Sequence, residues 1–141
     1  MKRVYLLLGI TLTVGAALCL LGGRFLSAQE PLKSGTVLQR TDIPGAPGME
    51  AILVLREVPP GKESGKHTQS AAEIVYILDG SATLEVSGKP ARTLKTGETF
   101  STTAGQVHNV KNASASAPTK ALAFYIAKKG AQLEDLAKPA K

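Results

Sequence analysis

The hydrophobic pattern divides the chain into two parts. Residues 4–21 form an uncharged apolar run, whereas from Gln29 onward short apolar or alternating stretches are separated by Gly, Pro, Asn and Asp. Short stretches bounded by frequent turn residues are typical of an all-β sandwich or barrel. The chain beyond residue 30 is therefore predicted to be all-β, without a long amphipathic helix.

The expected strands follow one another at short intervals. Residues 49–58 contain a continuous Ile-Leu-Val-Leu run, which is typical of a strand covered on both faces. Residues 73–78 and 82–87 are joined by Asp79-Gly80, and the second stretch alternates apolar with polar, so a hairpin is predicted. Further strands are expected at 36–40, 92–95, 98–101, 107–111 and 121–127, a loop at 112–119, one or two helical turns at 132–137, and disorder at 138–141.

The N-terminal run predicts a targeting segment. Met1-Lys2-Arg3 gives it a positive start, and Ala28 offers a cleavage position, so a signal peptide is predicted over 1–28 and a periplasmic or secreted location for the rest. The run also reaches the length of a membrane-spanning helix. An uncleaved N-terminal anchor that holds the protein at the membrane is therefore the alternative.

Cysteine and charge narrow the function classes. The single cysteine, Cys19, lies within the leader, so the mature chain offers no disulfide, no Cys-ligated zinc and no thiol nucleophile. Without Lys2, Arg3 and Arg24 the net charge falls from +6 to +3. The lysines that are left are scattered and have no aromatic residues among them, so no nucleic-acid partner is predicted.

The two histidines of the chain lie in two recognisable patterns. Gly61, His67, Gln69, Glu73 and Gly80 have the spacing G-x5-H-x-Q-x3-E-x6-G, and Gly97, Thr103, Gly105, His108 and Asn112 have the spacing G-x5-T-x-G-x2-H-x3-N. These patterns resemble the two motifs of the cupins, with Gln in place of a second His and Thr in place of Pro. The resemblance is to small single-domain bacterial cupins and implies a double-sheet jelly-roll barrel. It places the cupin domain at 36–129, after the signal or anchor helix, and a C-terminal tail at 130–141.

The resemblance implies that His67, Gln69, Glu73 and His108 converge on one divalent metal ion. Two imidazoles and one carboxylate with open positions suit non-haem iron, and manganese and zinc are the other candidates. Gln69 is the departure, since a neutral amide oxygen is a weaker ligand than imidazole. The site is therefore expected to bind metal more weakly, to prefer Mn²⁺ or Zn²⁺, or to have lost its metal. Glu73 precedes an apolar stretch, and a buried carboxylate needs a partner, for which metal is the simplest candidate. Asp79, Gly80, Gly97, Gly105 and Asn112 are expected to serve turns and packing.

Two function classes follow. The first is a metal-dependent enzyme, dioxygenase-like or related, that acts on a small polar molecule, and the second is a non-catalytic module that binds a small molecule. Only four aromatic residues lie beyond the leader, Tyr76, Phe100, Phe124 and Tyr125, which favours a compact ligand. The apolar stretches 52–55 and 121–127 expose more apolar surface than a small monomer needs, so a homodimer is predicted.

Overall fold

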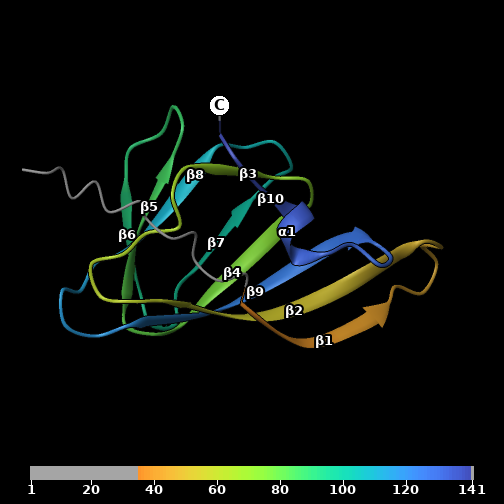
Figure 1. Ribbon diagram of the computed structural model, residues 1–141, viewed down its shortest axis with the longest axis horizontal. Coiled ribbons are helices and arrows are strands. Elements are labelled where there is room, and N and C mark those ends of the chain that lie inside the picture. Colours follow the sequence, from red (N-terminus) through yellow and green to blue (C-terminus); the bar gives the residue numbers. More distant parts are fainter. Residues whose placement is uncertain (1–34, 141) are drawn as a thin grey trace, which may run out of the picture. The chain divides into compact units, whose positions relative to one another are not determined.

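The computed structural model describes residues 35–140, which fold into strands and one helical turn (Figure 1). The strands are β1 (Thr36–Asp42), β2 (Met49–Val58), β3 (His67–Gln69), β4 (Ala72–Asp79), β5 (Ser81–Val86), β6 (Arg92–Lys95), β7 (Thr99–Thr102), β8 (His108–Asn112), β9 (Thr119–Lys128) and β10 (Ala137–Pro139), and the turn is α1 (Leu133–Leu136). They form two antiparallel five-stranded sheets. The first sheet has the order β1-β2-β9-β4-β7, and the second has the order β10-β3-β8-β5-β6. The all-β, two-sheet prediction is confirmed.

The core lies between the two sheets. Strand side chains alternate between faces, and in β2, β4 and β9 alternate residues are buried. Ile52, Ile77 and Tyr125 from the first sheet and Leu94 from the second are fully enclosed. The alternation within each strand thus supplies one apolar face that packs against the other sheet.

The turn between β4 and β5 is as tight as predicted. Gly80 alone separates the two strands and has a φ of 82°, a left-handed conformation that favours glycine. A β-carbon there would lie 3.1 Å from the carbonyl oxygen of Pro118. The Asp79-Gly80 pair therefore has the structural role that the sequence indicated.

Three features differ from the sequence prediction. The hairpin predicted for residues 73–78 and 82–87 is wrong, because β4 pairs with β7 and β9 in the first sheet, whereas β5 pairs with β6 and β8 in the second. Leu53 and Leu55 in β2 are only partly buried, because their side chains point to the outer face of the first sheet, which no other layer of the described chain covers. Disorder was expected from residue 138, but Lys138 and Pro139 belong to β10, which pairs with β3. Leu133 and Leu136 of α1 are buried in the core and hold the chain end in place for this pairing.

The outer face of the first sheet is apolar. Ile74, Tyr76, Leu78, Phe124 and Ile126 are exposed large hydrophobic residues of β4 and β9. Beside Phe124 lies a shallow hollow, lined by Gln39, Thr41, Ala51, Leu53 and Phe124. The fold thus presents a hydrophobic surface with a depression in it.

The predicted leader, residues 1–28, lies outside the described residues, as does the helix expected within it. Among the residues that the structure describes, no helix is both long and apolar enough to cross a membrane.

Candidate metal and ligand site

The four predicted site residues come from both sheets. His67 and Gln69 lie on β3 and His108 on β8 in the second sheet, whereas Glu73 lies on β4 in the first. Two residues separate β3 from β4, so the chain crosses from one sheet to the other between Gln69 and Glu73. The short connection is the reason that ligands close in sequence approach the site from opposite walls of the barrel.

The two histidines are cross-strand partners. His67 pairs with His108 in the β3–β8 register, and their ring centroids lie 4.2 Å apart. Each ring is fixed by a backbone carbonyl, since Nδ1 of His67 lies 2.9 Å from the oxygen of Gly65 and Nδ1 of His108 lies 3.0 Å from that of Gln106. A carbonyl oxygen only accepts, so both Nδ1 atoms carry a proton, and in the neutral form of each ring Nε2 keeps a lone pair.

The protonation state of His67 agrees with a ligand role. Burial lowers the pKa of His67, and the neighbouring His108 lowers it further, against the opposing hydrogen bond to Gly65. The ring is therefore held neutral near pH 7, which is the form of imidazole that binds metals.

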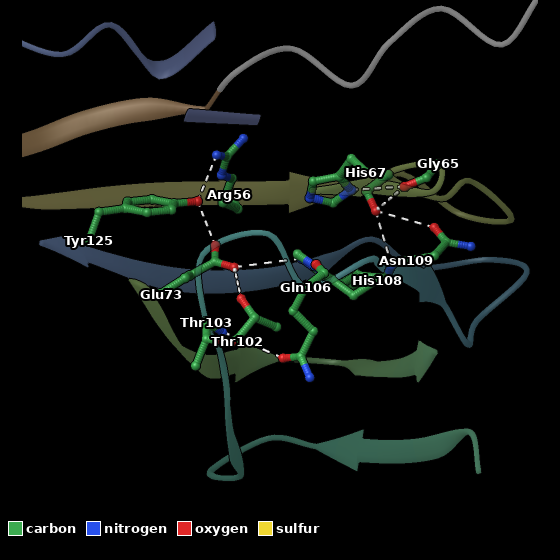
Figure 2. Close-up of polar contacts among 12 residues, drawn as sticks. Arg56, Gly65, His67, Glu73, Thr102, Thr103, Gln106, His108, Asn109 and Tyr125 are labelled. Carbon is green, nitrogen blue, oxygen red and sulfur yellow. Dashed lines mark hydrogen bonds and ion pairs between the residues drawn. The ribbon is translucent and has the colours of Figure 1, made fainter. Parts of the chain in front are cut away.

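Glu73 is buried and has polar partners of its own (Figure 2). The Tyr125 hydroxyl donates a hydrogen bond to Oε1 of Glu73, and the Thr102 hydroxyl lies 3.4 Å from Oε2. That second oxygen is 3.8 Å from Nε2 of His108. Metal was predicted as the simplest partner of this carboxylate, and Tyr125 is a partner from the protein itself that the sequence did not indicate.

Tyr125 links Glu73 to an arginine. Nη2 of Arg56 donates to the Tyr125 hydroxyl oxygen over 2.8 Å, so the phenol accepts from Arg56 and donates to Glu73, as Figure 2 shows. Burial and the Glu73 charge raise the pKa of Tyr125 well above its ordinary value. The phenol therefore keeps the proton that it donates to Glu73.

Gln69 carries an unusual atom. Its side chain is 4% exposed, and Oε1 is the buried side-chain polar atom without a hydrogen-bond partner among the residues described. An unpaired buried amide oxygen costs about 1–3 kcal/mol. Because β3 places Gln69 on the same side as His67, a cation or a donor beside the histidines would remove this cost.

The donor types fit a divalent metal, although the arrangement is incomplete. Two Nε2 lone pairs, one carboxylate oxygen and one unpaired amide oxygen make a mixed N/O set that suits Fe, Mn or Zn. In the described part of the chain, however, no three His, Cys, Asp or Glu side chains are placed to hold a metal ion as they stand. Glu73 is also hydrogen-bonded to Tyr125 and Thr102, while its Oε2 lies 3.8 Å from Nε2 of His108.

Two site residues were missed from the sequence. Arg56 and Tyr125 belong to strands predicted as apolar, and the sequence marked Tyr125 only as one of few aromatic residues. The sequence did contain a signal for Arg56. This residue continues the alternation of Ile52 and Val54, the positions of β2 that face the core. A charged residue at a core-facing position indicates a polar partner inside the barrel.

Asn112 ends the second motif in a structural role, as expected. Its amide nitrogen donates to the carbonyls of Val58 and Ala117, and its Oδ1 accepts from the Ser114 amide and the Thr119 hydroxyl. The side chain thereby ties the end of β8 to β2 and to the start of β9.

Comparisons with known proteins agree with this architecture. A family model described as Cupin domain matches residues 54–125. An uncharacterized conserved protein with a double-stranded beta-helix domain from Klebsiella pneumoniae is 20% identical, with 81% of this chain and 87% of that chain covered and a TM-score of 0.58. A cupin-like protein from Thermotoga maritima is 23% identical, with 64% and 65% covered and a TM-score of 0.50. KdgF from Halomonas sp. is 16% identical, with 64% and 89% covered and a TM-score of 0.50. No curated protein matches the chain.

Proposed function

This chain belongs to the cupin family, and we propose that its barrel binds one divalent metal ion through His67, Gln69, Glu73 and His108 and acts on a small polar molecule. The observation that carries the proposal is the unpaired buried Oε1 of Gln69 on the strand that also bears His67. A barrel without a cation would leave this oxygen unsatisfied and two Nε2 lone pairs unused.

Each residue of the proposed site would have a distinct role in binding the metal or the substrate. The carbonyls of Gly65 and Gln106 fix the two imidazoles with Nε2 available. Tyr125 holds one oxygen of Glu73, so the carboxylate would offer only Oε2. A bound divalent metal supplies a Lewis acid that polarises a substrate oxygen. Phe100 and Tyr125 are the two aromatic residues beyond the leader that are buried, which supports a compact substrate.

The alternative is a non-catalytic module that binds a small molecule. The lack of a ready three-ligand cluster in the described chain favours it, because Glu73 already has Tyr125 and Thr102 as partners. In that case the unpaired Gln69 oxygen would accept a hydrogen bond from the bound molecule.

Protein from its native compartment distinguishes the two functions. We expect elemental analysis to find close to one iron, manganese or zinc ion per chain. We also expect an intact mass that corresponds to a start near Gln29, because the leader is proposed to be a cleaved signal peptide. Protein that contains no metal and that binds a small molecule without converting it would support the binding module. A full-length mass in the membrane fraction would indicate an anchor, and one in the cytosol would contradict export.

We also propose a homodimer that pairs the outer faces of the first sheet. A two-fold interface needs a surface that complements itself, and here the exposed Phe124 projects beside the hollow lined by Ala51 and Leu53. Light scattering at micromolar concentration is expected to give twice the chain mass, and Phe124→Glu to give a folded monomer. Thr93→Glu, at an exposed residue of β6 in the second sheet, is the control. A strictly monomeric wild type would contradict the proposal.

A further inference from the structure

Arg56 has more hydrogen-bonding capacity than the described chain uses. Its side chain extends from the core-facing side of β2 and is partly buried between Val54 and Val58. A guanidinium has five N–H donors, yet within the described residues Arg56 has one hydrogen bond, to the Tyr125 hydroxyl. The guanidinium carbon also lies 5.8 Å from the centre of the Tyr125 ring.

Three other long cations contrast with Arg56, while Arg92, which contacts only the carbonyl of Thr99 within the described chain, is exposed. Arg40 pairs with Glu50, Lys111 pairs with Glu63 and Glu85, and Lys129 pairs with Asp42. Among the residues described, Arg56 forms no ion pair with a carboxylate, and its acceptor is a neutral phenol. Partial burial of an unpaired cation is costly, so the arrangement implies an anion that the described residues do not supply.

Arg56 is also close to the histidines. Its charge is among those that lower the pKa of His67, and Figure 2 shows its guanidinium on the same side of the barrel as that ring. Tyr125 fixes one edge of the guanidinium, because its hydroxyl is itself held by Glu73. The rest of the planar fork is thus positioned in advance beside the proposed metal ligands.

We propose that Arg56 binds the carboxylate of the substrate or ligand, which is therefore a small organic acid. The inference rests on the proposed function and specifies its substrate class. The planar fork matches a carboxylate in shape and charge. A phosphate dianion normally recruits several cationic or amide donors, whereas Arg56 is the one arginine that contacts the Tyr125–Glu73 pair in the described chain. Lysine would not replace it, since an ammonium lacks the fork.

The test uses metal-free protein and two probes of nearly equal shape. Glycolate carries a carboxylate, and glycolamide carries a neutral amide in its place. We expect glycolate to shift the NMR signal of the Arg56 Nε–H group saturably, and glycolamide not to do so. Arg56→Gln should raise the glycolate dissociation constant at least tenfold, and the matched Arg92→Gln, an exposed arginine on the edge strand β6, should leave it unchanged.

Several results would overturn the inference. They are equal glycolate affinity in wild type and Arg56→Gln, equal binding of glycolamide, and tighter binding of inorganic phosphate than of glycolate. If Arg56→Gln loses its dispersed NMR spectrum, Arg56→Lys replaces it, and a loss of affinity despite the retained charge is then the expected result.

A parallel Mn²⁺ titration separates this inference from the proposed function. Arg56 is not a proposed ligand, so Arg56→Gln is expected to retain Mn²⁺ binding, at least as tight as in the wild type, because a nearby positive charge is removed. If the wild type binds no metal, the metal proposal fails, while the dependence of glycolate binding on Arg56 still decides the role of this residue.

Discussion

We expect the affinity for Mn²⁺ or Zn²⁺ to fall more than roughly 100-fold when His108 is replaced by alanine. Loss of a partner that only orients a ligand lowers metal affinity about 10- to 100-fold, so loss of the ligand itself should do more. His67→Ala should have the same effect, and because His67 is less buried, it carries less risk to folding. Isothermal titration calorimetry of the folded variants measures the change, and Tyr125→Phe, which keeps every proposed ligand, should lose less.

Gln69 gives this prediction its internal control. Gln69→Ala should weaken binding less than either histidine variant, because an amide oxygen is the weakest of the four donors. Gln69→His should tighten the binding of Ni²⁺, Cu²⁺ or Zn²⁺ relative to Mn²⁺, since imidazole favours the later ions. Equal affinities for wild type, His67→Ala and Gln69→His would show that there is no metal site, and would leave the binding module.

Among the variants proposed for this protein, Asn112→Ala is expected to lose the most stability, roughly 2–4 kcal/mol in the free energy of unfolding. The change removes a partner of the Val58 carbonyl, the Ala117 carbonyl and the Ser114 amide. The Thr119 hydroxyl keeps the Ser81 carbonyl as its acceptor. Each group that stays buried without a partner costs about 1–3 kcal/mol, while the typical stability of a domain is only about 5–15 kcal/mol. The free energy of unfolding in urea measures this loss.

Asn109→Ala is the matched control on the same strand. The Asn109 amide contacts the carboxylates of Glu63 and Glu85, and both of these keep Lys111 as a partner. We therefore expect a loss less than half that of Asn112→Ala. An equal loss of unfolding free energy in the two variants would mean that the hydrogen bonds of Asn112 stabilise the fold no more than those of Asn109.

The sequence predicted most strands because their signal is local. Residues 49–58 and 92–95 match β2 and β6 to the residue, since turn residues bound both. Other ends differ, as in β9, which begins at Thr119 and ends at Lys128 rather than running from 121 to 127. There the hydrogen bonds to β2 continue through polar residues, which a hydrophobic pattern does not register.

The site was predictable only in part, because its contacts are not local. The motif spacings selected His67 and His108, and the structure makes them direct partners on neighbouring strands. The hydrogen bond from Tyr125 to Glu73 joins residues 52 positions apart, and no spacing rule predicts such a pair. The pairing of β10 with β3 was missed for the same reason, because a three-residue strand has no pattern of its own.

The position of β9 has a consequence for the order in which the molecule assembles. β9 lies between β2 and β4 and pairs with both. In the chain, however, it begins only at Thr119, long after β2 ends at Val58 and β4 ends at Asp79. Until β9 is available, β2 can pair only with β1 and β4 only with β7, so the edges of β2 and β4 that face β9 have no partner and the first sheet has no centre. The first sheet is thus completed only after β9 pairs with both strands, and the folding rate is expected to be limited by closure of long loops rather than by local hairpins. A nascent chain that ends before Thr119 would hold every proposed metal ligand but would lack the strand that brings the two halves of their barrel wall together.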